Sequence, residues 1–457
     1  MIIRSISGVR GLTSSHLNID SMCRYARALH IHLEEGLLFI GRDTRPSGEE
    51  LLEAFANELV RLGRDVIICG IVPTPTVQFM IERSEAAGGA IITASHNPIE
   101  WNGIKFVRSD STFFTSEDCD NLFDLADRNK PIKDSKKPGM VFPDQNSILK
   151  HSIKIVELST IDAKAIRASN FKVVIDAVNG AGSTALPLLL EHLGCDVVKI
   201  FCEGNGKFDR GTEPLPDHLE KLKKSVIKNN ADVGFAVDPD ADRLAVVNEK
   251  GIPLGEEYTL VLAAEGYIRQ KKSKEIFVTN LSTSLALDKM AEQYGCSVQR
   301  AAVGEINVVK KMLEIGSEFG GEGNGGVILK EAHLGRDSLV GVAMVLNRMS
   351  QEKIPISKIH ESLPQFHIIK DKIDLDKVDK DVVITQAISI FKDAKIDKTD
   401  GLKLSWDDRW IHLRGSNTEP ILRIYAEAPT KSEAHLLVDR IRAVSYTHLT
   451  LPTNREV

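Results

Sequence analysis

Three aspartates at alternate positions are the first group in the sequence that could do chemistry. Asp238, Asp240 and Asp242 follow the apolar run Val233-Gly-Phe-Ala-Val, and alternate residues of an extended loop point the same way. Carboxylates packed this closely repel one another unless a cation lies among them. An all-oxygen ligand set suits a hard ion such as Mg²⁺. The spacing therefore predicts a magnesium site, with a solvated acidic turn as the alternative.

A serine in the segment Thr93-Ala-Ser-His-Asn-Pro is a candidate nucleophile. Ser95 lies at a strand-to-loop transition, where a hydroxyl can be exposed. The neighbouring His96 suggests a Ser–His hydrolase, but adjacent residues rarely point at each other, and the G-x-S-x-G turn of α/β-hydrolases is absent. A lone serine is most often a turn or capping residue, so the significance of Ser95 depends on the other loops.

Two further loops carry groups that bind ligands. Arg414-Gly-Ser-Asn-Thr-Glu-Pro offers a guanidinium, hydroxyls and an amide, which favour a bound phosphate over a plain turn, and Arg423 on the following strand can join it. Gly321-Glu-Gly-Asn-Gly-Gly is rich in glycine, so its backbone can approach a ligand closely. Glu322 and Asn324 in this loop can hydrogen-bond to sugar hydroxyls. The loop does not match the dinucleotide-binding pattern.

The elements that must position these loops follow a repeated pattern. Three β-rich runs begin comparable units and a second strand follows in each, at residues 37–44 and 63–69, 171–178 and 194–200, and 275–280 and 295–300. Each unit ends in one chemistry-bearing loop. Strands that alternate with helical segments indicate βαβ units and a largely parallel sheet, in which ligands bind beyond the carboxyl ends of the strands. We therefore expect a threefold α/β repeat, unless the similarity is that of any βαβ unit.

Chain length and texture predict several domains. A chain of 457 residues corresponds to about three domains. After about residue 365 a charge-dense segment marks a change in composition. We expect α/β domains with mixed, largely parallel sheets, and then a smaller α+β domain with a helix and strands near Leu402–Trp406 and Ile421–Ala426. The expected boundaries are 1–150, 151–254, 255–364 and 365–444. Residues 445–457 lack helical periodicity, and we expect them to be a non-native tail outside the fold.

Composition excludes several classes of protein. The chain has 58 Lys and Arg against 64 Asp and Glu, a formal charge of −6, which argues against a nucleic-acid partner. No apolar run approaches the roughly 18 residues of a membrane span, and the first residues do not resemble a signal peptide. The six cysteines are scattered, with no C-x-x-C pair. These features predict a reduced, cytoplasmic enzyme or binding protein, either a monomer or a dimer.

Taken in order, the four loops resemble those of the α-D-phosphohexomutase superfamily over about residues 1–443. The Ser95 loop resembles the family's phosphoserine loop, and Asp238-Pro-Asp-Ala-Asp-Arg resembles its metal loop, usually D-G-D-G-D-R. The Gly321 loop is similar to the sugar loop, and the Arg414 loop to the phosphate loop. Shorter matches are Ser7-Gly-Val-Arg-Gly, Gly41-Arg-Asp-Thr-Arg-Pro-Ser-Gly and Asn102-Gly-Ile-Lys.

The resemblance implies three similar α/β domains and a fourth domain around one central cleft. It also implies a phosphotransferase-type isomerase that interconverts hexose 6-phosphate and hexose 1-phosphate. Phosphorylated Ser95 would give its phosphoryl group to a sugar monophosphate, and the bisphosphate would turn round and return the other phosphate. Mg²⁺ would be held by a phosphoserine oxygen and the three aspartates, and a hexose bisphosphate would be the activator.

Further roles come from the same resemblance, residue by residue. Lys105 is similar to the family's proton-transfer residue, Arg10 and His96 to residues near the transferring phosphate, and Arg243 to an arginine near the substrate. Glu322 and Asn324 would contact the sugar. The non-reacting phosphate would be held by Arg414, Ser416, Asn417, Thr418 and Arg423.

The departures from the family pattern lie mainly in recognition loops. Pro239 and Ala241 replace the usual glycines of the metal loop without removing a ligand. The sugar loop lacks the common E-x-S-G-H ending and has Asn324 and Gly326 where Ser and His often stand. This loop looks most like that of the phosphoglucosamine mutase branch, so we expect glucosamine 6-phosphate and glucosamine 1-phosphate as substrates. A phosphomannomutase or phosphoglucomutase is the alternative, and a phosphatase and a non-catalytic sugar-phosphate-binding protein stay open.

Overall fold

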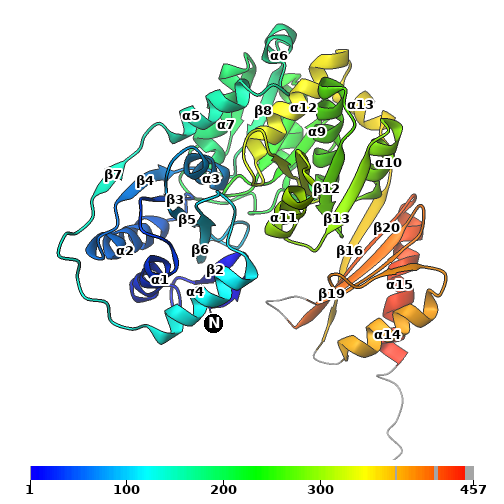
Figure 1. The fold of residues 1–457 in the computed structure, drawn as a ribbon. Helices are drawn as coiled ribbons and strands as arrows, with labels where there is room; N and C mark the ends of the chain where they lie inside the picture. The colour runs from blue at the N-terminus through cyan, green and yellow to red at the C-terminus, as the bar shows by residue number, and fades with distance from the viewer. Residues whose placement is uncertain (1, 376–377, 416–419, 448–457) are drawn as a thin grey trace, which may run out of the picture.

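The computed structural model describes residues 2–375, 378–415 and 420–447. The described residues form four sheets: the first lies on the left of Figure 1, the second and third towards the top, and the fourth at the lower right. No helix in these ranges has both the length and the apolar character to cross a membrane. All six cysteines lie within them as free thiols.

The first sheet has the strand order β1-β2-β6-β5-β3-β4-β7. Leu38 and Ile40 of β3 lie in one apolar core, whereas Phe39 lies in the core on the opposite face, as expected for a strand buried on both faces. Helices α1, α2 and α4 cover the first face and α3 covers the second. The bounds are β1 Ile3–Ser5, β2 Gly8–Leu12, α1 Ile19–His32, β3 Leu38–Arg42, α2 Gly48–Arg61, β4 Val66–Ile71, α3 Thr74–Glu82, β5 Gly88–Ile92, β6 Trp101–Arg108, α4 Ser116–Arg128 and β7 Val141–Pro143.

The second sheet, β11-β10-β8-β9, repeats the centre of the first. In both, three parallel strands are followed by an antiparallel strand that forms a hairpin with the last of them: β5 with β6, and β10 with β11. The bounds are α5 Ser147–Val156, α6 Ala163–Ser169, β8 Lys172–Asp176, α7 Gly182–His192, β9 Asp196–Ile200, η1 Pro216–His218, α8 Glu220–Asn229, β10 Val233–Val237 and β11 Leu244–Asn248.

The third sheet, β13-β12-β14-β15, shows the same arrangement, with β14 and β15 as the hairpin. The structure therefore confirms the threefold repeat and the predicted strands that begin each unit. One apolar core runs through the second and third units without interruption. The bounds are α9 Glu256–Lys271, β12 Ile276–Asn280, α10 Leu285–Gln293, β13 Ser297–Ala301, α11 Glu305–Ile315, β14 Phe319–Glu322, β15 Gly326–Leu329, α12 Ser338–Glu352 and α13 Ile356–Ser362.

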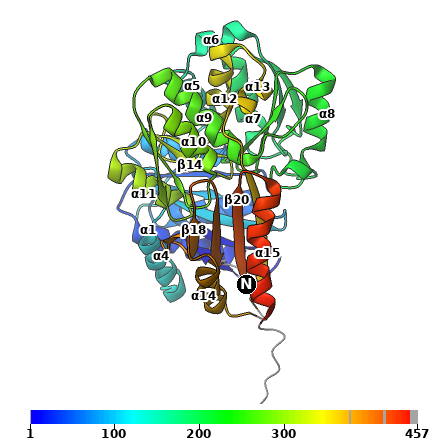
Figure 2. The same ribbon diagram turned by 90° about the vertical axis from the view of Figure 1, so that its right-hand side faces the viewer.

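The fourth sheet, β16-β20-β19-β18-β17, is antiparallel throughout. Helices α14 and α15 share its apolar core, and Figure 2 shows α15 running beside the strands. This confirms the smaller α+β unit. The bounds are β16 His367–Asp374, α14 Lys380–Ile390, β17 Lys395–Asp397, β18 Leu402–Ser405, β19 Trp410–Gly415, β20 Ile421–Ala428 and α15 Lys431–Thr447.

Two expectations for this last unit differ from the structure. The charge-dense segment contains β16: Ile369 and Ile373 pack against the core, but Asp371 between them accepts a hydrogen bond from Arg442, which breaks the apolar alternation. Helix α15 runs to Thr447, so residues 445–447 belong to a helix and not to the expected tail. Residues 448–457 of the expected tail lie outside the described residues.

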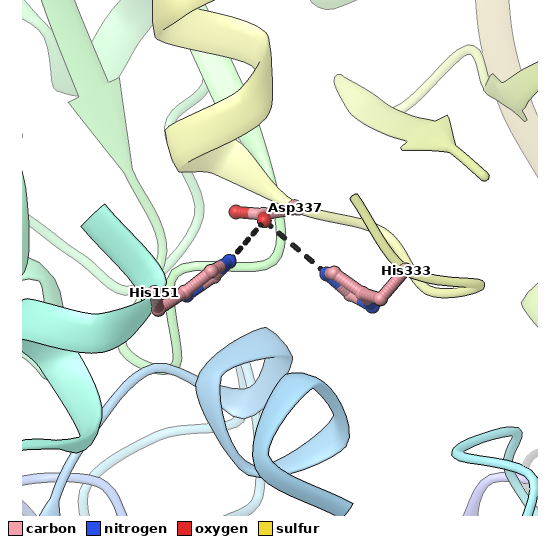
Figure 3. A group of neighbouring side chains, drawn as sticks. All are labelled: His151, His333 and Asp337. Atoms are coloured by element: carbon pink, nitrogen blue, oxygen red, sulfur yellow. Dashed lines mark hydrogen bonds and ion pairs between the residues drawn. The ribbon is translucent and has the colours of Figure 1, made fainter. Parts of the chain in front are cut away.

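A buried cluster joins the second unit to the third and packs against α3 of the first. In Figure 3 the imidazoles of His151 from α5 and His333 both point at the carboxylate of Asp337, the N-cap of α12. Their Nε2 atoms lie 2.9 and 3.2 Å from the same Oδ2 atom, and Oδ1 accepts the N–H of Leu339. These distances fit direct pairing between the imidazoles and the carboxylate, and the three side chains also lie close enough together to hold a metal ion.

We expect Asp337→Asn to lower the free energy of unfolding by about 2–4 kcal/mol, because two buried imidazoles lose their anionic partner. The amide oxygen can still cap α12, so the loss reports the imidazole contacts. Urea unfolding measures the difference, with the exposed Asp217→Asn as the control. Equal stability of the two variants would contradict an energetic role for the cluster.

Candidate active site

A single buried arginine fixes the loop that carries Ser95. The guanidinium of Arg45 pairs with Asp43 at 3.1 Å and donates hydrogen bonds of 2.6–3.0 Å to backbone carbonyls of the β5–β6 loop, those of Ser95, Asn97, Pro98 and Trp101. Sequence reasoning noted the Gly41 motif that contains Arg45 but gave it no role. Arg45 holds the loop in one conformation and so positions Ser95.

Ser95 contacts both its neighbour and the metal loop. Its Oγ lies 3.2 Å from Nδ1 of His96 and 3.1 Å from Oδ2 of Asp238. The expectation that Ser95 and His96 do not meet was wrong, because Ser95 adopts φ = +51° and this left-handed turn brings the two side chains together. The positive charge of Arg243, followed by burial, holds the pKa of His96 well below its usual value, so a neutral imidazole faces the hydroxyl.

The three aspartates of the β10–β11 loop form a buried group that can hold a metal ion. Asp238, Asp240 and Asp242 are fully buried, and one oxygen of each lies within 4.8 Å of the others. Oδ1 of Asp240 and Oδ1 of Asp242 have no hydrogen-bond partner in the described part of the chain. Ala241 takes φ = +54°, so the turn usually built with glycine is kept. Unpartnered buried carboxylate oxygens fit a hard divalent cation.

Lys105 on β6 brings a cation to the same group. Its Nζ lies 2.6 Å from Oδ2 of Asp240 and 3.0 Å from Oδ2 of Asp242. Burial opposes the charged form, but the two carboxylates outweigh it and raise the pKa of Lys105. Burial, followed by the charges of Asp240 and Asp242, raises the pKa of Asp238 well above its usual value. Two cationic side chains, Lys105 and Arg336, thus contact the group of three carboxylates.

Two more arginines, Arg10 and Arg243, lie in the cleft beside the Ser95 loop and the aspartate loop. Arg10 donates to Oδ1 of Asn97 at 2.7 Å, and Arg243 donates to Oε1 of Glu213 at 2.9 Å. Nε of Arg243 is buried without a hydrogen-bond partner among the described residues. Both side chains line the cleft. They supply positive charge where the resemblance expects a transferring phosphate.

A second pair of arginines lies on the fourth sheet. Arg414 of β19 and Arg423 of β20 are directly opposite each other, an arrangement that is destabilising for like charges. Nε of Arg414 pairs with Asp400 at 2.8 Å, whereas Nε of Arg423 has no hydrogen-bond partner among the described residues. An anion between two guanidiniums would relieve their repulsion. The expected partners Ser416, Asn417 and Thr418 lie outside the described residues.

The loop that the resemblance expects to contact the sugar is the β14–β15 hairpin. Oε1 of Glu322 accepts from Nδ2 of Asn280 at 2.8 Å and from the N–H of Gly304 at 3.0 Å, and Oε2 accepts from Nη1 of Arg336 at 2.9 Å. Oδ1 of Asn324 is buried with no partner in the described chain. Glu322 is therefore held in place by the protein, and Asn324 keeps a free acceptor.

These groups share one cleft of about 840 Å³ between the four units. The hairpin loops β5–β6, β10–β11 and β14–β15 occupy equivalent places in the three repeats and meet there. Of the expected residues described by the structure, all but the three buried aspartates line the cleft: Arg10, Ser95, His96, Lys105, Arg243, Glu322, Asn324, Arg414 and Arg423. The aspartates lie directly beneath, in contact with Ser95 and Lys105.

Sequence reasoning missed residues that hold these groups in place. Thr74 at the start of α3 donates to Oδ2 of Asp240 at 2.7 Å, and Arg336 contacts Asp242 and Glu322. Gly335-Arg-Asp repeats the Gly41-Arg-Asp sequence of the first unit, and this repeated tripeptide was the available signal for Arg336. Thr74 had no signal in the sequence.

Comparison with known families decides the assignment. Models of the four phosphoglucomutase/phosphomannomutase domains match the chain in order: α/β/α domain I at residues 2–133, domain II at 150–251, domain III at 255–366 and the C-terminal domain at 372–444. The chain belongs to the phosphoglucomutase/phosphomannomutase family. The resemblance seen in the sequence is thereby confirmed.

Known family members match over nearly their whole length. A phosphoglucomutase/phosphomannomutase of Thermococcus kodakarensis is 35% identical, over 93% of this chain and 94% of that protein. A phosphoglucosamine/phosphogalactosamine mutase of Sulfurisphaera tokodaii is 29% identical, over 96% and 97%. The crystal structure of a family protein from Burkholderia thailandensis superposes with a TM-score of 0.84 at 24% identity, over 98% and 99% of the two chains. At this sequence identity, the structural similarity supports the fold alone.

Proposed function

We propose that this chain is a Mg²⁺-dependent phosphohexose mutase that works through phosphorylated Ser95. The observation that carries the proposal is the position of the Ser95 hydroxyl, 3.1 Å from Asp238 of the buried carboxylate group, in a cleft whose other wall carries Arg414 and Arg423. One end of the cleft thus suits phosphoryl transfer, and the other suits a phosphate that does not react. A sugar that carries a phosphate at either end can bridge them in two orientations.

The residues divide the reaction between them. Transfer breaks the Oγ–P bond of phosphoserine and forms an O–P bond to the sugar, whose hydroxyl gives up its proton; Ser95 takes up a proton as it leaves. Lys105, a buried cation, and neutral His96 are the groups placed to carry these protons. Arg10 and Arg243 hold the transferring phosphate. Asp238, Asp240 and Asp242 would hold Mg²⁺, which when bound neutralises charge on the transferring group.

The remaining steps use the same residues in reverse. After the bisphosphate turns round, Ser95 accepts its other phosphate and the sugar oxygen recovers a proton, so atoms and charge balance over the cycle. Arg414 and Arg423 hold whichever phosphate is not reacting, with Ser416, Asn417 and Thr418 proposed as further donors. We propose a hexose bisphosphate as the activator, because it can phosphorylate Ser95 directly.

The test is a coupled assay of hexose 1-phosphate isomerisation with Mg²⁺ and a catalytic amount of the bisphosphate. Isomerisation much faster than release of inorganic phosphate supports a mutase, since a cleft closed to water favours return of the phosphoryl group to sugar. Phosphate release that keeps pace would show a phosphatase. No turnover in protein that carries phosphoserine, verified by mass spectrometry, would show a binding protein.

The matching domain models support a division of the chain into four domains. We propose the boundaries 1–150, 151–254, 255–364 and 365–444. The apolar core that continues through the second and third units indicates that these two move together as one body. The polar contacts of Lys370 on β16 with Glu257 of α9 join the fourth domain to the third beside the cleft.

For the substrate we propose glucosamine phosphate. The relative from Sulfurisphaera tokodaii is named for amino-sugar phosphates, whereas the one from Thermococcus kodakarensis is named for glucose and mannose phosphates. The names of the relatives therefore do not decide between these two classes of substrate. Glu322 and Asn324 both line the cleft, and the carboxylate of Glu322 suits an ammonium or a hydroxyl donor on the sugar. The glucose and mannose esters are the alternative.

We expect kcat/KM to be highest for glucosamine 1-phosphate when it is compared with mannose 1-phosphate and glucose 1-phosphate. The physical reason is that the negative charge of Glu322, which lines the cleft, attracts an ammonium group on the sugar more strongly than a neutral hydroxyl. Each substrate is measured with its own bisphosphate activator. A mannose or glucose ester that wins by more than about tenfold, roughly 1.4 kcal/mol, would overturn the glucosamine assignment while leaving the mutase assignment intact.

A further inference from the structure

Arg336 connects the metal loop to the sugar loop. Its Nη2 lies 2.7 Å from Oδ2 of Asp242 and its Nη1 lies 2.9 Å from Oε2 of Glu322. Its Nε donates to Oε2 of Glu305, the first residue of α11, at 2.9 Å. The three nitrogens of one guanidinium thus serve three different carboxylates, a geometry that a lysine cannot reproduce. The side chain is nine-tenths buried and lines the cleft.

The stem of Arg336 occupies the space of a side chain at position 326. A Cβ added to Gly326 would lie 2.3 Å from Cδ and 2.8 Å from Cγ of Arg336. Gly326 is not among the glycines with positive φ, so its backbone conformation would accept another residue. Only the neighbouring side chains exclude one. The common E-x-S-G-H form of this loop has a histidine at the position of Gly326. Here the guanidinium of Arg336 reaches the loop from ten residues further along the chain.

We propose that Arg336 is a positioning residue for the sugar loop and takes the place of the missing side chain at 326. This inference rests on the proposed function. Arg336 holds Oε2 of Glu322, while Asn280 and Gly304 hold its other oxygen, so the carboxylate that meets the sugar has one orientation. Arg336 also offsets the charge of Asp242, and it therefore competes with a metal cation for the carboxylate group.

These two roles predict opposite effects when the guanidinium is removed. In Arg336→Gln, Glu322 loses its charged partner, so KM for the preferred sugar phosphate should rise about tenfold or more. The carboxylate group loses a competing cation, so its affinity for Mn²⁺, measured by electron paramagnetic resonance without sugar, should stay equal or increase several-fold. In Arg336→Lys, KM should lie between the values of Arg336→Gln and the wild-type enzyme. General damage to the site would weaken both sugar and Mn²⁺ binding, and that result, or an unchanged KM, overturns the proposal.

Position 326 provides a second, independent test. Gly326→His alone should raise KM as Arg336→Gln does, because the imidazole displaces the stem of Arg336. The double variant Gly326→His/Arg336→Ala should be more active than either single change, since the imidazole then has the vacated space. A double variant worse than both single variants contradicts the exchange.

A matched control separates these effects from the loss of any buried arginine. Arg348 of α12 is buried in ion pairs with Glu265 and Glu352 outside the cleft. Arg348→Gln should reduce thermal stability and leave KM and Mn²⁺ affinity unchanged; a matching rise in KM would count against a specific role for Arg336. Wild-type protein inactive with every hexose phosphate would refute the proposed function, and the Mn²⁺ measurement would still decide the role of Arg336.

Discussion

Ser95→Ala should abolish mutase turnover, with a loss of about 10⁴-fold or more, because the covalent step has no other acceptor. The neighbouring His96 cannot substitute without a new geometry, since Arg45 fixes the loop backbone around Ser95. Sugar-phosphate binding should persist, because the arginines of the fourth sheet do not depend on Ser95. Turnover with the bisphosphate activator and calorimetric binding of the sugar phosphate measure the two properties separately.

A second serine–histidine pair offers the control for this variant. Oγ of Ser152 lies 2.9 Å from Nδ1 of His192, outside the cleft and equally buried. Ser152→Ala should therefore keep near-normal turnover, although it removes the same atom. A Ser95→Ala enzyme with a rate close to that of Ser152→Ala would refute the phosphoserine mechanism.

Asp238→Asn should lower kcat/KM by roughly 10³-fold and shift the Mg²⁺ dependence to higher concentration. Oδ1 of Asp238 accepts the backbone N–H groups of Asp242 and Arg243, and an asparagine oxygen can keep both. The loop should thus remain folded, while the oxygen that faces Ser95 becomes an amide donor that cannot bind a cation. Rates measured across a Mg²⁺ titration, with a chelated sample as zero, report the loss.

Asp176→Asn is the matched control for the metal loop. Asp176 ends β8 in the same sheet, is fully buried and pairs with Arg210 at 2.9 Å, but it does not contact the carboxylate group or line the cleft. Its variant should lose stability and keep the Mg²⁺ midpoint of the wild-type enzyme. If both variants showed the same Mg²⁺ midpoint as wild type, Asp238 would not be a metal ligand.

Local patterns in the sequence were sufficient for the repeat and for the principal groups of the site. The strands that begin each unit are short, β-branched and bounded by glycines, and each hairpin loop carries side chains that have little reason to occur together in a plain turn. Ser95 and the three aspartates could therefore be named before any geometry was known, and the family resemblance added Lys105. In the structure Ser95 contacts Asp238, and Lys105 contacts Asp240 and Asp242 of the same loop.

What the sequence could not provide depends on contacts between distant segments. Thr74 is an ordinary helix start until Asp240 lies beside it, and Arg336 becomes informative only when its stem is found over Gly326. The contact of Ser95 with His96 depends on one backbone angle. Strand β16 was missed because Asp371 interrupts the apolar alternation on its inner face, and its charge is satisfied by Arg442, about 70 residues away.

The histidine cluster of Figure 3 also constrains the order in which a newly made chain can finish folding. His151 leaves the ribosome 186 residues before its acceptor, Asp337. At about 5–20 residues per second, translation of that interval takes about 10–40 s. Throughout this time the imidazole, which stacks on Phe79 of the first unit in the complete structure, lacks the carboxylate of Asp337. The first unit can therefore form its sheet early, but its surface towards α5 is completed only when the third unit has been synthesised.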